Sequence, residues 1–307
     1  MKLSIIIINW NTVNLLIQCL ESVPDPSCDS WQNDLEVLVV DNASTDNSVQ
    51  HVRERFPWVK LIENNENVGF ARANNQAIHQ STGKYILLLN PDTEVKPDAL
   101  KNLLSFVDEF PEVGAVGPQI LNPDGSLQIS CYPVPTLKRE LWRLLHLDAI
   151  RPYGVYQMHK WPLDQVRSVD VLLGACLLLR REVLEQVGLL DDNYFMYSEE
   201  VDLCFRVQKA GWQICWVPDA QIVHYGGQST QQIATEMFLQ LYKGKLQYFR
   251  KNHSRLAGIV YKFILLIASL GRLALTPLAW LERPTQRRHH LTLANRYWRL
   301  VAALPGL

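Results

Sequence analysis

Apolar positions in the first 120 residues follow two alternating patterns. Runs of consecutive apolar, often β-branched residues are typical of strands buried on both faces of a parallel sheet, and they occur at 3–8, 35–40, 59–62 and 85–89. Between these runs, apolar residues recur at helical spacing over 13–23 and 70–80, and Pro97 is placed to open a further helix. The alternation predicts an α/β fold, with a Rossmann-like, mostly parallel sheet flanked by helices.

The alternation weakens after Gly117. A turn at Asn122 to Gly125 predicts a hairpin, and an apolar strand region over 169–179 is interrupted by Gly174. The pattern then predicts a helix over 198–210, a strand over 214–217 and a helix over 228–252. We therefore expect one domain over residues 1–230, with a nucleotide-binding half at 1–117 and an acceptor and catalytic half at 118–230.

The chain ends in a segment of a different kind, a helical extension over 231–307. Residues 256–281 are apolar except for Lys262 and Arg272, which divide the run into stretches shorter than the roughly 20 residues that span a bilayer. Basic residues follow at Arg283, Arg287, Arg288, His289 and His290. The combination favours a segment that lies in a membrane interface. The alternative is a helix packed on the domain or on a dimer partner.

Composition adds limits on compartment and partners. With 307 residues, 48% of them hydrophobic, the chain can bury a sizeable core, and its net charge of -1 argues against broad nucleic-acid binding. None of the six cysteines forms a C-x-x-C pair, so we expect reduced and mostly buried thiols. The apolar N-terminal run is short and lacks a small-residue cleavage site, which is typical of a strand rather than a signal peptide. We expect a cytoplasmic protein unless it is held at a membrane.

Polar residues follow each predicted strand abruptly, where ligands bind in parallel sheets. Asp41 follows the second strand in a Ser- and Asn-rich loop, where a carboxylate can accept hydrogen bonds from a ribose or a base. Asp46 is the better helix cap, which would leave Asp41 free. Asp92 follows the fourth strand, where it can hold a divalent cation that neutralises a departing diphosphate.

Two further groups are candidates for chemistry. The acids Glu199, Glu200 and Asp202 open a predicted helix after an aromatic cluster; the helix dipole alone would favour acids there, but one of them is also suited to act as a general base. His224 precedes two glycines and can be a metal ligand, a phosphate contact or a core histidine. The phosphate loops G-x-x-x-x-G-K-[ST] and G-x-G-x-x-G and the elbow G-x-S-x-G are absent from the sequence, which removes the main support for P-loop, dinucleotide-dehydrogenase and α/β-hydrolase activities.

Six segments in this order resemble the family 2 glycosyltransferases of GT-A fold, and most closely their bacterial rhamnosyltransferase-like branch. They read SIIIINWN, VVDNASTDNS, NENVGFARANNQAI, LLLNPDTEV, GACLLLRREVLEQVGLLDDNYFMYSEEVDLCFRVQKAGW and HYGGQS. The resemblance covers roughly residues 3 to 230. It implies a nucleotide site made by Asn9, Trp10, Asn11, Asp41, Asn67, Gly69, Arg72 and Asn90.

For the chemistry, the resemblance implies that Asp92 is the last acid of a metal-binding D-x-D motif, that His224 joins the metal and that Glu200 is the base. Asn90 stands where the motif has its first Asp, so one charged ligand is lost. Glu200 stands where the family has Asp, which leaves the choice between Glu199 and Glu200 open, and Asp202 is assigned to the acceptor side.

The implied function is inverting transfer of a sugar, with rhamnose suggested by the branch, from a nucleotide diphosphate donor. Mg²⁺ or Mn²⁺ is the implied cofactor, and the acceptor is a polysaccharide or a lipid-linked glycan. The implied location is peripheral, on the inner face of the cell membrane, and no nucleic-acid partner is expected. A sugar-nucleotide nucleotidyltransferase is an alternative, although its Gly-rich basic loop is missing after the first strand. A non-catalytic nucleotide- or sugar-binding module is a second alternative.

Overall fold

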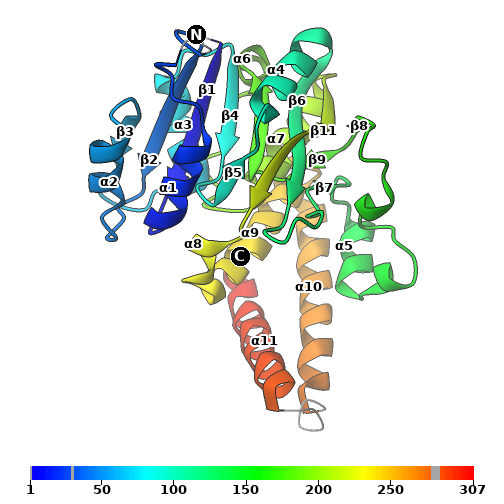
Figure 1. Ribbon diagram of the computed structural model, residues 1–307. Coiled ribbons are helices and arrows are strands. Elements are labelled where there is room, and N and C mark those ends of the chain that lie inside the picture. Colours follow the sequence, from blue (N-terminus) through cyan, green and yellow to red (C-terminus); the bar gives the residue numbers. More distant parts are fainter. Residues whose placement is uncertain (1, 29–30, 278–283) are drawn as a thin grey trace. The chain divides into compact units, whose positions relative to one another are not determined.

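The protein is described here from a computed structural model that covers residues 2–28, 31–277 and 284–307 (Figure 1). The chain divides into two compact units. We call the first the sheet unit; it comprises Met1–Val134, Tyr156–Phe195 and Glu199–Gln232. The second, the helical unit, comprises Pro135–Val155, Met196–Ser198 and Ile233–Leu307.

Half of the main sheet is parallel, as the apolar runs predict. β1 (Leu3–Asn9) lies between β2 (Leu35–Asp41) and β4 (Tyr85–Leu89), and β3 (Lys60–Glu63) pairs with β2. All three pairings are parallel. The strands are connected by α1 (Val13–Ser22), α2 (Ser48–Arg55) and α3 (Phe70–Gln80).

The other half of the nine-stranded sheet is mixed. β10 (Cys176–Arg180) runs antiparallel between β4 and β6 (Val113–Leu121), and β11 (Gln213–His224) is parallel to β6. Two short strands, β5 (Thr93–Val95) and β8 (Arg167–Ser168), pair antiparallel with β11. A separate two-stranded sheet joins β7 (Cys131–Tyr132) to β9 (Val171–Leu172). β9 leads through three residues to β10, which belongs to the main sheet.

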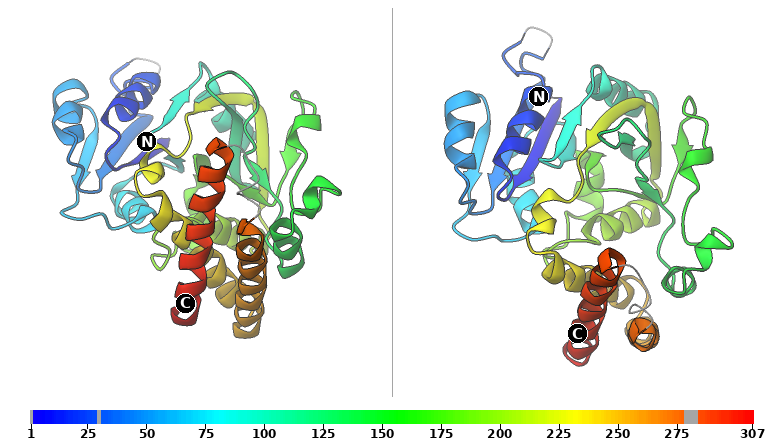
Figure 2. Two further views of the ribbon diagram at one scale, coloured as in Figure 1. Left: turned by 90° about the horizontal axis from the view of Figure 1, so that it is seen from below. Right: turned by 60° about the horizontal axis from the view of Figure 1, so that its bottom comes forward.

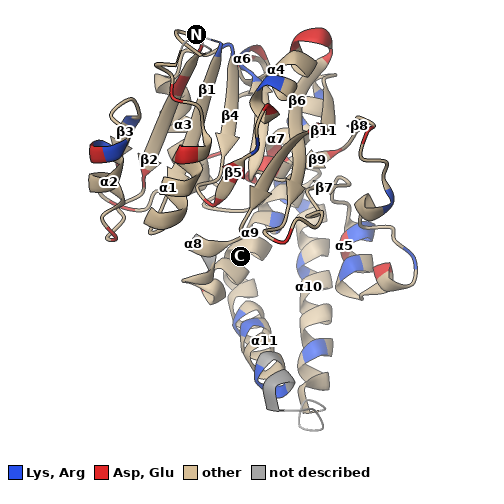
Figure 3. Cartoon of the chain, in the orientation of Figure 1, with Lys and Arg blue, Asp and Glu red and all other residues tan. Residues whose placement is uncertain are grey.

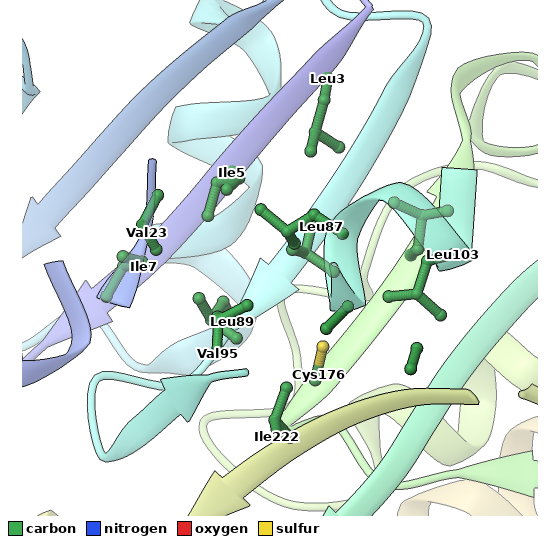
Figure 4. Packing of buried hydrophobic residues seen from close by; sticks show 14 of the residues in the cluster. Leu3, Ile5, Ile7, Val23, Leu87, Leu89, Val95, Leu103, Cys176 and Ile222 are labelled. Carbon is green, nitrogen blue, oxygen red and sulfur yellow. The ribbon is translucent and has the colours of Figure 1, made fainter. Parts of the chain in front are cut away.

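Two hydrophobic clusters cover the two faces of the main sheet. Alternate residues of β1 point to opposite faces, so Leu3, Ile5 and Ile7 enter one cluster while Ile6 and Ile8 enter the other. Figure 4 shows the first cluster, in which Ile5 and Ile7 lie with Leu87 and Leu89 of β4. Helices α1, α2 and α4 (Ala99–Glu109) cover this face. Helices α3, α6 (Arg181–Val187) and α7 (Glu199–Lys209) cover the other.

Some predicted boundaries move. Helix α4 begins at Ala99, so Pro97 lies just before it instead of opening it. Strand β11 extends well beyond the predicted 214–217 and reaches His224, because it pairs with β6 along its length and with β5 at its end. The predicted helix over 228–252 is two helices, α8 (Gln228–Gln231) and α9 (Ala234–Asn252). One 3₁₀ turn, η2 (Met158–Lys160), completes the sheet unit.

The helical unit contains α5 (Leu137–Leu144), α9, α10 (Arg255–Leu275) and α11 (Pro284–Ala303), with 3₁₀ turns η1 (Leu147–Ala149) and η4 (Leu304–Gly306). Helices α10 and α11 lie side by side (Figure 2). Glu140 is buried in this unit, where Lys245 contacts its carboxylate at 2.7 Å and Tyr261 donates to it at 3.2 Å. Burial raises the pKa of Glu140, but the charges of Lys245 and Arg143 outweigh it, and the net pKa is lowered.

All six cysteines are free thiols, and all but Cys28 are buried. This confirms the prediction from their spacing. Burial raises the pKa of Cys19 to about 12, so this thiol stays protonated and acts as a small apolar side chain.

Candidate functional site

The carboxyl ends of β1 and β2 are joined by side chains predicted to bind the nucleotide. Asn9 Nδ2 donates to Asp41 Oδ2 at 2.8 Å, and the backbone N–H of Ser44 donates to Asp41 Oδ1, also at 2.8 Å. The expectation that Asp41 would be free is therefore wrong, since both of its oxygens shape the loop. A carboxylate has about four acceptor sites, so it keeps capacity for a ligand. Asp46 does cap, accepting from the N–H groups of Ser48 and of Val13 at the start of α1.

The loop after β1 is held in a defined conformation by the loop after β2. Asn11 has a positive φ of 52°, which Asn tolerates, and its Oδ1 accepts from the backbone N–H of Thr45 at 2.8 Å. Ser44 Oγ accepts from Asn9 Nδ2 and from the backbone N–H of Asn11. Trp10, which lies between Asn9 and Asn11 in the sequence, is half-buried. Ser44 was not among the predicted residues, although the polar run that contains it was.

The loop that leads into α3 lies against the segment that leads toward α7. Asn67 Oδ1 accepts from the backbone N–H of Gly69 at 3.0 Å, and Phe70 N–H donates to the carbonyl of Phe195 at 2.7 Å. Gly69 has a φ of 86°, and a Cβ there would lie 2.6 Å from the Phe195 oxygen, so only glycine fits. Arg72, on the first turn of α3, is exposed and forms no ion pair with the described residues.

Sheet register brings Asp92 to His224. Thr93 of β5 is paired with His224 of β11, and the N–H of Tyr225 donates to the carbonyl of Asp92 at 2.9 Å. Asp92 and His224 are 5% and 7% exposed, and Asp92 Oδ1 lies 3.3 Å from His224 Nε2. Within the described part of the chain, Nε2 has no hydrogen-bond partner, so the two atoms are close without being aligned as donor and acceptor.

This pair has the chemistry of a partial metal site. Oxygen and imidazole ligands at about 2.1 Å from one cation and at right angles to each other would be about 3 Å apart, which fits the observed separation. Among the described residues there is no group of three or more His, Cys, Asp or Glu that could hold a metal by itself. The protein thus offers two ligands, and a cation bound here would need oxygens from a ligand such as a diphosphate.

The segment between β9 and β10 connects this part of the site to the acidic helix. Backbone N–H of Asn90 donates to the carbonyl of Ala175 at 2.9 Å. A Cβ at the neighbouring Gly174 would lie 3.6 Å from Cβ of Glu200. The loop after β4 and the start of α7, far apart in sequence, therefore meet at Gly174 and Ala175. The sequence marked Gly174 only as an interruption in a strand.

Glu199 and Glu200 differ in environment. Glu199 is buried, and its Oε2 has no hydrogen-bond partner among the residues that the structure describes. Burial, and then the charge of Glu200, raise the pKa of Glu199 well above its ordinary value. Glu200 is partly exposed as a residue, although its Oε2 is buried. Tyr197 and Ser198, directly before the pair, have φ values of 68° and 72° and so adopt a costly left-handed backbone.

Asp202 has a structural partner. It is fully buried, and its carboxylate accepts from Arg206 Nε at 2.8 Å. The other guanidinium nitrogens of Arg206 donate to the carbonyls of Val187, Gly188 and Leu189. This contact joins α7 to the end of α6, and the predicted role of Asp202 at the acceptor stays a prediction that the geometry does not support.

Comparison with known proteins identifies the class. Residues 4–188 match Glycosyl transferase family 2, and because the match covers more than half of the chain, the protein belongs to this family. It is therefore a glycosyltransferase with a GT-A-type fold. The nucleotidyltransferase and binding-module alternatives are not favoured.

Among curated relatives, an N-acetylglucosaminyl-diphospho-decaprenol L-rhamnosyltransferase of Mycobacterium tuberculosis is 33% identical over 235 residues, covering 72% of this chain and 76% of the relative. Rhamnosyltransferase WbbL of Escherichia coli K12 is 28% identical over 193 residues, covering 60% and 70%. A solved structure of a mannosyltransferase from Pyrobaculum calidifontis, in complex with GDP-Man and Mn2+, superposes with a TM-score of 0.57 at 20% identity. It covers 98% of this chain and 85% of that one, and it supports the fold alone.

Proposed function

We propose that this protein transfers a rhamnosyl group from a nucleoside diphosphate donor to a lipid-linked glycan, with inversion at the anomeric carbon. The observation that carries the proposal is that the Gly174–Ala175 segment contacts both Asn90 and Glu200. It brings a loop suited to a sugar diphosphate next to Glu200, a partly exposed residue whose carboxylate is suited to accept a proton. The similarity to a rhamnosyltransferase acting on a diphospho-decaprenol glycan supports the choice of donor sugar and acceptor class.

On the donor side, we assign the nucleoside to Asn9, Trp10, Asn11 and Asp41, which gather at the ends of β1 and β2. Asn67, Gly69 and Arg72 would cover it, with Asn90 nearby. Arg72 is an exposed cation that forms no ion pair with the described residues, which suits it to contact the diphosphate. The carboxyl group of Asp92 and the imidazole of His224 would hold Mg²⁺ or Mn²⁺. When bound, this ion neutralises charge on the diphosphate.

The proposed reaction is a single in-line displacement. The acceptor hydroxyl oxygen attacks the anomeric carbon, and Glu200 accepts the proton that this hydroxyl loses. The bond from the anomeric carbon to the diphosphate oxygen breaks, and its electron pair leaves with the diphosphate. Glu200 is preferred to Glu199 because Glu199 is buried and its raised pKa keeps it protonated.

We also propose that the helical unit binds the inner face of the cell membrane without crossing it. By length and composition, α10 is the one described helix that could span a bilayer. Its residues Gly258, Tyr261, Leu265, Ala268 and Ser269 are nevertheless buried within the protein. The opposite face exposes large apolar side chains at helical spacing, at Leu256, Ile259, Phe263, Ile267 and Leu270. One buried face and one exposed apolar face suit a helix lying in an interface.

The charges of α10 and α11 also support binding of the helical unit at a membrane surface. Helices α10 and α11 carry Lys and Arg but no Asp or Glu (Figure 3). Basic residues near an anionic leaflet contribute about 1 kcal/mol each. A transferase held in this way would meet a lipid-linked acceptor at the membrane surface.

The proposal is tested by a donor screen with purified protein. Release of nucleoside diphosphate is measured for dTDP-, UDP- and GDP-sugars with Mn²⁺, and again after EDTA. We expect dTDP-rhamnose to be hydrolysed slowly, with the rate lost in EDTA and restored by Mn²⁺ or Mg²⁺. Full activity in EDTA would contradict the assignment of Asp92 and His224, whereas preference for another sugar would contradict the donor.

A further inference from the structure

Gln128 lies outside every predicted motif, yet it contacts the ring of His224. It follows the hairpin turn after β6, and its Oε1 lies 2.7 Å from His224 Nδ1. Its Nε2 lies 3.2 Å from the carbonyl oxygen of the same histidine and 2.8 Å from Asn122 Oδ1. One amide thus contacts both the main chain and the imidazole of His224.

These contacts fix which atom of the Gln128 amide faces which partner. A backbone carbonyl can only accept, so the amide nitrogen must face the carbonyl of His224. The amide oxygen then faces Nδ1, and an amide oxygen can only accept. His224 Nδ1 must therefore carry the proton and donate it to Gln128.

The hairpin turn holds Gln128 in this orientation. Asn122 Nδ2 donates to Ser126 Oγ at 2.9 Å, and Ser126 Oγ donates to Asp124 Oδ1 at 2.6 Å. The Asp124 carboxylate can only accept, so Ser126 Oγ donates its one proton there and accepts from Asn122 Nδ2. Asn122 Oδ1 is then the atom that faces Gln128 and accepts from its Nε2. The turn residues therefore continue a one-directional chain of hydrogen bonds in which donation begins at His224 Nδ1 and ends at the Asp124 carboxylate.

With the proton on Nδ1, a neutral His224 has a lone pair on Nε2. That atom is buried, lies 3.3 Å from Asp92 Oδ1 and has no hydrogen-bond partner in the part of the chain that the structure describes. Two acceptors this close in a buried position repel each other unless a cation lies between them. Metal-binding histidines commonly donate their second N–H to such an acceptor, which sets the tautomer and the ring orientation.

We propose that Gln128 is a positioning residue that holds His224 with Nε2 unprotonated and directed, together with Asp92, at a divalent cation. The inference rests on the metal site of the proposed function. It also gives the hairpin after β6 a role in the site, since the turn is what orients Gln128.

The test is Mn²⁺ affinity of the full-length protein, measured calorimetrically with a nucleoside diphosphate present. Gln128→Leu removes the acceptor, and we expect Mn²⁺ to bind about 10- to 100-fold more weakly, the usual effect of losing such a partner. Gln128→Glu keeps an acceptor for Nδ1 but loses the amide donor to Asn122 and to the His224 carbonyl, so we expect its Mn²⁺ affinity to lie between those of the wild type and Gln128→Leu. Gln221→Leu is the matched control, because Gln221 lies on the same strand as His224 and its side-chain amide donates to Gln119.

A double-variant cycle separates positioning from general damage. In a His224→Ala background, Gln128→Leu should cause little further loss of affinity, because the ring it orients is gone. Equal unfolding midpoints for the variants would show that all are folded. The proposal is overturned if Gln128→Leu binds Mn²⁺ like the wild type, or if it weakens binding as much in the His224→Ala background as in the wild type. If the wild type binds no Mn²⁺, the metal site of the proposed function is itself wrong, and the inference falls with it.

Discussion

The backbone N–H of Phe70 donates a hydrogen bond of 2.7 Å to the carbonyl oxygen of Phe195. The bond joins the loop of Asn67 and Gly69 to the segment that runs into Glu199 and Glu200. Main-chain atoms make this contact, and it holds the proposed donor loop beside the segment that leads to the proposed catalytic acids.

Gly69→Ala should disrupt this junction. The added Cβ would lie 2.6 Å from the Phe195 oxygen, at a residue whose φ is 86°. The left-handed backbone alone costs a non-glycine residue about 1–2 kcal/mol, and the clash with backbone adds to it. We expect a lower unfolding midpoint and a loss of donor hydrolysis greater than the loss of stability explains.

Gly211→Ala is the matched control for this substitution. Gly211 has a φ of 93°, but a Cβ there would meet nothing within 4 Å. It should lose stability through backbone strain and keep its donor hydrolysis. Equal losses of activity in the two variants would contradict a specific role for the contact between Gly69 and Phe195.

Glu200→Gln should remove the base. The substitution keeps the size of the side chain and removes the proton acceptor, so transfer should slow by about 10²- to 10⁴-fold. Donor affinity, measured by nucleotide competition, should change little. If Glu199→Gln is the inactive variant while Glu200→Gln retains activity, the assignment of the pair is reversed.

Glu199→Gln should change how stability depends on pH. The folded pKa of Glu199 is raised above its ordinary value of 4.5. Well below pH 4.5 the residue is therefore protonated in both the folded and the unfolded state, and it adds no pH dependence to the free energy of unfolding. As pH rises above that value, the unfolded state ionises while the folded state keeps its proton, and stability falls by up to about 1.4 kcal/mol per pH unit until the folded pKa is reached. Glutamine does not titrate, so its contribution to stability does not change with pH in this way.

The free energy of unfolding of Glu199→Gln minus that of the wild type should therefore increase between pH 5 and pH 7. Denaturant titrations at the two pH values measure it. A difference that does not change with pH would show that Glu199 is ionised in the folded protein.

Exposed apolar residues of α10 should control membrane binding. Phe263 and Ile267 are 60% and 68% exposed, and burying a large apolar side chain contributes about 1.5–3 kcal/mol. The double variant Phe263→Ser/Ile267→Ser should sediment much less with vesicles rich in anionic lipid. Leu163→Ser, at a residue 52% exposed on the sheet unit, should sediment like the wild type. A wild-type protein that does not bind such vesicles would make α10 a packing or dimerisation element.

The sequence predicted the parallel half of the sheet well. Runs such as 35–40 and 85–89 are buried on both faces, so their apolar pattern is unbroken and appears directly in the sequence. The mixed half was harder, because β5 is three residues long and β8 two, and β5 pairs with a part of β11 that lies more than 100 residues further along the chain.

The position of Asp41 and Asp92 at strand ends was predictable, because each lies at or just beyond the end of an apolar run on its own chain segment. The contact of Gln128 with His224 was not, because it depends on a hairpin folding back onto β11, and nothing in its neighbours distinguishes Gln128 from a surface glutamine. The hydrogen bond from Asn9 to Asp41 was also missed, because it depends on the pairing of β1 with β2, which brings the two residues together across the sheet.

The most direct test is to analyse the product of the full-length protein given dTDP-rhamnose, Mn²⁺ and an N-acetylglucosaminyl-diphospho-prenol acceptor. Mass spectrometry and NMR of the extracted lipid identify the added sugar and its anomeric configuration. The account predicts an acceptor heavier by one deoxyhexosyl residue, with a configuration opposite to that of the donor, and product formation about 10²- to 10⁴-fold slower with Glu200→Gln. A product with retained configuration, or a Glu200→Gln variant as active as the wild type, would contradict a single displacement assisted by Glu200.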